Sequence, residues 1–120
     1  MDKLLHKEYS VSEKLAMYSE IRKAIAGEMM SLGDAQWQEL REYLDWTENN
    51  FVCRLKAEHP QLSDYGLKLC MLVRLRLTDS MLAHIFHVSE ISIKQRLQRM
   101  KKALGIDGKK VSTRAYIVKY

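Results

Sequence analysis

One stretch of the chain, residues 90–104, carries basic and amide side chains at a spacing that suits anion binding. At about 100° per residue in a helix, its apolar side chains fall on one stripe and its polar side chains on the other face. The stripe consists of Ile93, Leu97, Met100 and Leu104, and the opposite face of Ile91, Lys94, Gln95, Gln98, Arg99 and Lys102. Lys and Arg bind phosphates or guanine, and Gln can bond adenine edges, so the pattern predicts contact with a nucleic acid.

The charge of this stretch is one-sided. A helix face that only keeps a protein soluble normally interleaves Glu with Lys, but no acid follows Glu90 before residue 104. The imbalance extends to the whole second half of the chain. Residues 1–60 hold 8 basic and 11 acidic side chains, whereas residues 61–120 hold 12 basic and 4 acidic ones. A polyanionic partner is therefore expected for the second half only.

The elements around this stretch form a recognisable arrangement. Ser89 is placed to cap the helix 90–104, and Gly105 to stop it. A short helix over 80–86, capped by Thr78 or Asp79, precedes it across residues 87–89. Its inward residues are expected to be Leu82, Ala83 and Phe86. Two short helices joined by three or four residues fit the helix-turn-helix pattern.

Further upstream, the chain has the signals of more helices. Ser63 or Asp64 should cap a strongly apolar, buried stretch from Leu67 to Leu77, with Arg74 and Arg76 on its exposed side. In the first half, apolar residues recur at helical spacing over 11–29 and again from residue 34 onward, where Asp34 is the expected N-cap. Asn49-Asn50 should kink or split the second helix, and Pro60 should end it. These stripes are either a dimerisation or partner-docking surface or an ordinary helical hairpin, which is their more usual role.

Composition narrows the class of protein. The chain has 120 residues, 47% of them hydrophobic, with one Pro and five Gly, which favours a helical domain over a turn-rich all-β fold. No apolar run is long enough to span a bilayer, and no secretory signal is visible, so we expect a cytoplasmic protein. Cys53 and Cys70 are expected to be buried thiols. No phosphate loop, zinc motif or nucleophile elbow occurs, so neither an enzyme nor a cofactor is expected.

Other potential ligands have ordinary explanations. His84 and His87 could share a helical face, but no compact set of four ligands accompanies them, so no metal site is expected. The methionines, including Met71, Met81 and Met100, are expected to fill the core.

Residues 62–106 contain an ordered series of short motifs, namely Leu62-Ser63, Leu82-Ala83, Val88-Ser89, Ser92-Ile93-Lys94 and Leu104-Gly105-Ile106. In this order and spacing, the motifs resemble the LuxR/GerE-type DNA-binding domain. Trp37, Phe51, Pro60 and Leu69-Cys70 also resemble a variant that bacterial regulators carry at their C-terminal end after a helical linker. The resemblance implies that the helix starting near Ser89 enters the major groove. Lys94, Gln95 and Gln98 would then face base edges, with Ser92 and Arg99 closer to phosphates.

The chain departs from the family pattern at several places. Asp79-Ser80-Met81 replaces the usual Asn-Lys-Glu, which removes a phosphate-binding Lys and adds a repelling charge. Arg76 stands where the family has a helix-ending Gly, so that turn is expected to close differently. Arg96 and Ala103 replace a His and a Lys. Residues 112–118 could form the family's fourth helix, a frequent dimer contact, although their β-branched content also allows a strand.

The sequence therefore predicts an all-α chain with a helical dimerisation or linker region over 1–60 and a helix-turn-helix domain over 61–120. It predicts a sequence-specific transcriptional regulator, or the DNA-binding C-terminal part of one, that binds double-stranded DNA. The predicted contacts are Ser89, Ser92, Lys94, Gln95, Gln98, Arg99 and Lys102. A homodimer is expected because such proteins bind paired half-sites, and an upstream sensor domain or partner protein could supply the signal. The alternative is a helical protein–protein interaction module that keeps the fold without specific DNA binding.

Overall fold

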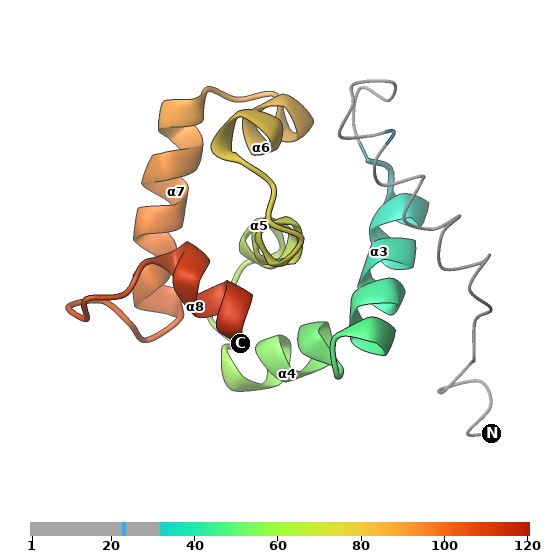
Figure 1. The fold of residues 1–120 in the computed structure, drawn as a ribbon, viewed down its shortest axis with the longest axis horizontal. Helices are drawn as coiled ribbons and strands as arrows, with labels where there is room; N and C mark the ends of the chain where they lie inside the picture. Colours follow the sequence, from blue (N-terminus) through green and yellow to red (C-terminus); the bar gives the residue numbers. More distant parts are fainter. Residues whose placement is uncertain (1–22, 24–31) are drawn as a thin grey trace.

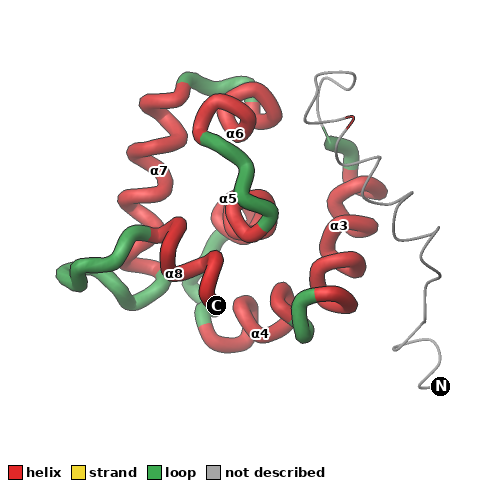
Figure 2. Tube along the Cα trace, viewed as in Figure 1, coloured by secondary structure: helices red, strands yellow, loops and turns green. Residues whose placement is uncertain are grey.

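The computed structural model describes residue 23 and residues 32–120, and every regular element in this part of the chain is a helix (Figures 1 and 2). The helices are α3 (Asp34–Thr47), α4 (Phe51–Glu58), α5 (Asp64–Arg74), α6 (Asp79–Phe86), α7 (Glu90–Ala103) and α8 (Thr113–Lys119). The all-α prediction is confirmed. Apart from residue 23, the helix predicted over 11–29 lies outside the described residues. None of the described helices has the length and apolar character that crossing a membrane requires.

Helix α5 lies at the centre of the fold (Figure 1). It begins at Ser63, whose side chain accepts a hydrogen bond from the Gly66 N–H at 3.0 Å, as the predicted cap requires. Most of its side chains are buried, which matches its apolar sequence. It packs against α3, α4 and α8. A fully buried Leu such as Leu69 or Leu72 contributes roughly 1.5–3 kcal/mol, so α5 anchors the hydrophobic core.

Helices α3 and α4 are separated at the two asparagines, as the sequence predicts. Asn49 and Asn50 both take left-handed backbone conformations, with φ of 55° and 57°. The Asn50 side chain makes no capping hydrogen bond. Asp45 of α3 caps α4 in its place, because its carboxylate accepts hydrogen bonds from the backbone N–H groups of Val52 at 2.7 Å and Cys53 at 3.1 Å.

The ends of the helices differ from the predictions by a residue at some places. Gly33 is the N-cap of α3, and Asp34 is the first helical residue. Helix α7 ends at Ala103, one residue before the predicted end. The stop signals themselves are confirmed, since α4 ends two residues before Pro60. Gly105 follows α7 with φ of +72°, a conformation that glycine adopts at little cost.

A single hydrophobic core runs through the described part of the chain. Leu40 and Leu44 of α3 and Phe51 and Leu55 of α4 belong to the same buried cluster as the apolar residues of α5 to α8. The boundary predicted between residues 60 and 61 therefore does not separate two cores here. The apolar stripes of α3 and α4 are used inside the chain, as in an ordinary helical hairpin.

The C-terminal segment is a helix, not a strand. Ser112 caps α8 by accepting the Ala115 N–H at 3.0 Å, and Ile117 is fully buried. Two arginines secure α8 to the rest of the fold. Arg54 of α4 donates to the Tyr120 carbonyl at 3.0 Å, and Arg74 of α5 donates to backbone carbonyls of α8.

Several burial predictions were wrong. Arg74 is not on an exposed side, because its side chain is 18% exposed and bound to Glu48 and α8. Cys53 is exposed, and only Cys70 is a buried thiol, with its pKa raised to about 12 by burial. Phe86 is half-buried, whereas its neighbour Ile85 is in the core. Met81 is 39% exposed, so it does not fill the core, unlike Met71 and Met100.

The turn after α5 keeps the left-handed backbone conformation expected of a glycine. Arg76 occupies this position with φ of +66°. A non-glycine residue therefore closes this turn in a left-handed conformation. Leu77, one residue later, is buried, and its N–H bonds back to the Leu72 carbonyl at 3.3 Å. These contacts of Leu77 hold Arg76 in its strained backbone conformation.

Candidate nucleic-acid interface

Helices α6 and α7 are joined by a short and well-defined connection, residues 87–89. Thr78 caps α6 by accepting the Met81 N–H at 3.2 Å. Helix α6 ends at Phe86, and its C-cap His87 has φ of 57°. The Val88 N–H then bonds back to the Ala83 carbonyl at 3.0 Å. Ser89 caps α7 by accepting the Ser92 N–H at 3.1 Å, as predicted. These local bonds fix where α7 begins relative to α6.

The apolar stripe predicted for α7 is buried, and this fixes the rotation of the helix. Ile93, Leu97 and Met100 all belong to the core, together with Leu104 just after the helix. Helix α7 packs against α6 and α8 through this side. The opposite side of the helix therefore faces outward (Figure 1).

The outward side of α7, which we call the basic face, carries the polar residues that the sequence singles out. It consists of Lys94, Gln95, Gln98, Arg99 and Lys102, and all five are exposed. Within the described part of the chain, none of these side chains takes part in a hydrogen bond or an ion pair. Ile91 in the first turn is 67% exposed. The donors of the basic face are therefore available to a ligand.

The two predicted serine contacts lie at the start of α7, beside the basic face. The Ser89 side chain is exposed, but its hydroxyl oxygen already accepts the capping hydrogen bond. Ser92 is half-buried. Both remain able to donate a hydroxyl proton, which is the role that a phosphate contact would require.

Two further cations of α7 lie on its flanks and behave differently. The Arg96 guanidinium lies over the Tyr65 ring, 4.2 Å from its centroid. Tyr65 in turn stacks on Phe86 at 4.8 Å, and Phe86 on Trp37 at 5.9 Å. Arg96 is thus part of an aromatic stack. Lys101, on the other flank, is half-buried and faces the segment that leads into α8.

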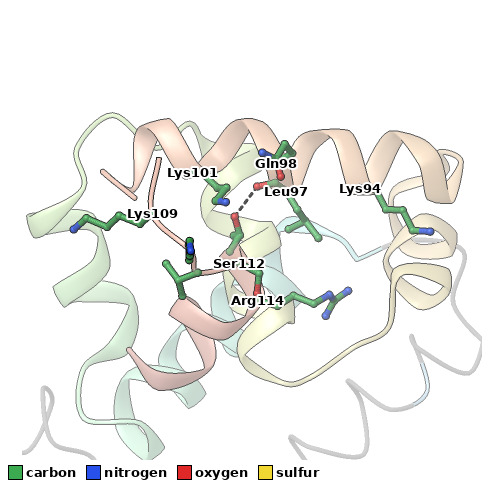
Figure 3. Close-up of a pocket in the computed structure, with 10 residues that line it drawn as sticks. Lys94, Leu97, Gln98, Lys101, Lys109, Ser112 and Arg114 are labelled. Atoms are coloured by element: carbon green, nitrogen blue, oxygen red, sulfur yellow. Dashed lines mark hydrogen bonds between the residues drawn. The ribbon is translucent and has the colours of Figure 1, made fainter. Parts of the chain in front are cut away.

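A groove of about 380 Å³ lies between α7 and the segment that precedes and begins α8 (Figure 3). We call it the basic groove. Its lining residues are Lys94, Leu97, Gln98, Lys101, Lys109, Lys110, Val111, Ser112, Thr113 and Arg114. Five of these carry a positive charge and none carries a negative one. Lys94 and Gln98 belong to both the basic face and the groove, so the two surfaces are continuous.

Sequence reasoning missed three cations of this groove, namely Lys109, Lys110 and Arg114. The only local signal was the Lys109-Lys110 pair after Gly108. Its position beside α7 depends on a contact between residues distant in sequence. The Thr113 hydroxyl donates to the Leu97 carbonyl at 2.6 Å, and Thr113 is only 3% exposed (dashed line in Figure 3).

Asp79, which the sequence marks as a repelling charge, has a partner. The Arg114 guanidinium donates to its carboxylate at 2.5 Å and to the Leu77 carbonyl at 2.6 Å. An ion pair at this distance offsets most of the field of the carboxylate at longer range. Its repulsion of a polyanion is therefore smaller than the sequence suggests.

The residues that the structure describes contain no cluster of three or more His, Cys, Asp or Glu side chains that could hold a metal ion. His84 and His87 are both exposed.

No protein-family model, curated protein or solved structure matches this chain.

Proposed function

We propose that this chain is a cytoplasmic, sequence-specific DNA-binding regulator of transcription, or the DNA-binding part of one. In this proposal α6 and α7 act as a helix-turn-helix and α7 enters the major groove. The observation that carries the proposal is the basic face, where five exposed polar side chains have no partner within the described residues and no acid lies among them. The resemblance of residues 62–106 to LuxR/GerE-type domains points the same way.

The side chains of the basic face divide into two proposed roles. Gln95 and Gln98 can each bond an adenine edge in a bidentate manner, and Lys94 can bond guanine. Arg99 and Lys102 would bind phosphates, as would the hydroxyls of Ser89 and Ser92. Base contacts specify the sequence, whereas phosphate contacts position the helix and add affinity for any duplex.

Paired half-sites are a common target of helix-turn-helix proteins, so we propose that the chain binds DNA as a homodimer. The dimer contact would lie in the first helices or the tail. An upstream sensor domain or a partner protein would control it. Light scattering with and without DNA tests this point, and a strictly monomeric mass at high concentration in both cases would contradict it.

Selection of bound sequences from random duplexes, followed by fluorescence anisotropy titrations, tests the main proposal. Replacing Gln98 or Lys94 with Ala should relax the sequence preference, by about 1–3 kcal/mol at the base pair concerned. Replacing Arg99 or Lys102 should weaken all duplexes alike. Lys56 on α4 is exposed and remote in sequence from this face, so Lys56→Ala serves as the control. Absence of duplex binding by the wild-type chain at low salt would overturn the proposal.

The alternative, a helical protein–protein interaction module, has weaker support. It rests on Asp79, Ser80 and Met81 and on the apolar residues of the first half. Asp79 is paired with Arg114, and the apolar residues of α3 and α4 named above are buried in the core. The large apolar side chains that are exposed in the described part are Met81 and Ile91.

A further inference from the structure

The basic groove offers a second anion-binding surface beside the basic face. Its five cations come from two segments that are remote in sequence, namely α7 and residues 109–114. The one acid that follows Glu90 in the chain, Asp107, does not line the groove. Lys109 and Lys110 are exposed, and neither side chain has a hydrogen-bond or ion-pair partner in the part that the structure describes.

The cations are spread along the groove and do not converge on one point. Lys94 and Lys109 lie at its two ends and point away from each other, with Gln98 and Lys101 between them along α7 (Figure 3). A small anion would need several donors directed at one place, whereas a chain of phosphates needs cations in series. We infer that the basic groove binds the sugar–phosphate backbone of a DNA duplex, next to the bases that α7 contacts. This inference rests on the proposed function.

The groove is held in shape by contacts on its inner side. The buried hydrogen bond from Thr113 to the Leu97 carbonyl joins the segment to α7. Arg114, although it lines the groove, is bound to Asp79 and the Leu77 carbonyl and so anchors the start of α8 to the start of α6. The segment that carries Lys109 and Lys110 is therefore attached on one side, which reduces the entropy lost when DNA binds.

The basic groove is continuous with the basic face, and this determines where the DNA backbone would lie. Lys94 and Gln98 line both surfaces, so a duplex whose base edges meet the basic face has a phosphate strand beside the groove. Lys109 and Lys110 would contact that strand without reading its sequence. The groove then adds affinity and salt dependence, but no preference for particular bases.

The experiment compares two double variants of the full chain that remove the same charge. Lys109→Ala/Lys110→Ala removes two positive charges from the far end of the groove. Lys56→Ala/Lys119→Ala removes two exposed lysines outside it and is the matched control. Binding to a selected and an unrelated duplex is measured by anisotropy between 50 and 200 mM salt. Each lost phosphate contact lowers the slope of log K against log salt by about 0.9, so the groove variant should lose about 2 from the slope.

The groove variant should keep the wild-type preference between the two duplexes. In phosphate ethylation interference it should also lose sensitivity at one or two phosphates that matter to the wild type. Circular dichroism should show unchanged helicity, because neither lysine packs on the core. A loss of slope no larger than that of the control, with wild-type duplex binding intact, would overturn the inference and leave the proposed function standing. A change in sequence preference would also overturn it, and a wild type that binds no duplex would overturn both.

Discussion

Replacing Arg74 with Met should lower the free energy of unfolding by about 2–3 kcal/mol. The guanidinium joins three elements of the fold. Its Nε donates to the Glu48 carboxylate at 3.0 Å, and its Nη1 donates to the Ile117 carbonyl at 3.2 Å and to the Val118 carbonyl. It also lies over the Phe51 ring, 5.4 Å from the centroid. Methionine keeps most of the apolar stem, so the change removes mainly the charge and its hydrogen bonds.

The size of the loss in unfolding free energy depends on which hydrogen-bond acceptors lose their donor. Glu48 can turn toward water, because its side chain is 36% exposed, so the ion pair contributes little once solvent screening is counted. The Val118 carbonyl is in the last turn of α8 and has no acceptor role within the helix. A hydrogen bond from a charged donor to a shielded carbonyl contributes about 1.5–3 kcal/mol. With the smaller contribution of Ile117, the total of about 2–3 kcal/mol corresponds to a fall in Tm of roughly 10 °C.

Urea denaturation followed by circular dichroism at 222 nm measures this change. Arg76→Met is the matched control, because Arg76 is exposed and has no side-chain partner within the described residues. The control should stay within about 0.5 kcal/mol of the wild type. The reasoning is refuted if Arg74→Met is as stable as the control, since the contacts to α8 would then contribute nothing.

Three further predictions concern single sites. The hydrogen bond to the Asp45 carboxylate and partial burial raise the pKa of Cys53, so Asp45→Asn should speed alkylation of this thiol at pH 8 by several-fold, as mass spectrometry would record. Gly105→Ala should lower the free energy of unfolding, measured by urea denaturation, by about 1 kcal/mol. The whole effect should come from backbone strain, because φ of Gly105 is +72° and an added Cβ meets no atom within 4 Å. An unchanged stability would contradict this. Burial and the Glu58 carboxylate raise the pKa of Tyr120, so its contribution to stability should be complete below pH ~10 and fall as the pH rises above it. Tyr120→Phe should flatten that fall in denaturation curves measured between pH 9 and pH 11, and an equal slope in both proteins would argue against it.

The features of α7 could be predicted because they are local. A serine cap, an apolar stripe of period 3.6 and a terminal glycine all lie within one segment of the chain, and each acts over a few residues. Ser89, Ile93 and Gly105 accordingly take the places that the sequence assigns to them. The split between α3 and α4 was predictable for the same reason, since two consecutive asparagines readily adopt left-handed conformations.

The features that could not be predicted depend on residues far apart in sequence. Arginines are usually exposed, so nothing local in the sequence places Arg74 under α8, which lies more than forty residues further along the chain. The position of Lys109 and Lys110 beside α7 likewise depends on the buried bond of Thr113, a residue whose partner is 16 positions away. Local sequence patterns carry no information about such tertiary contacts between distant residues.

Asp79 shows why the surface charge of a protein cannot be predicted from its sequence alone when distant residues form ion pairs. Counted alone, it is an acid at the start of α6. In the fold it pairs with Arg114, 35 residues away, and both side chains are partly shielded from water. The pair removes one anion and one cation from the field that a duplex would meet. In the proposed complex, the positive charge that DNA meets is therefore carried by the lysines of the groove and by the basic face of α7. The ion pair keeps the segment that bears two of those lysines attached to α6.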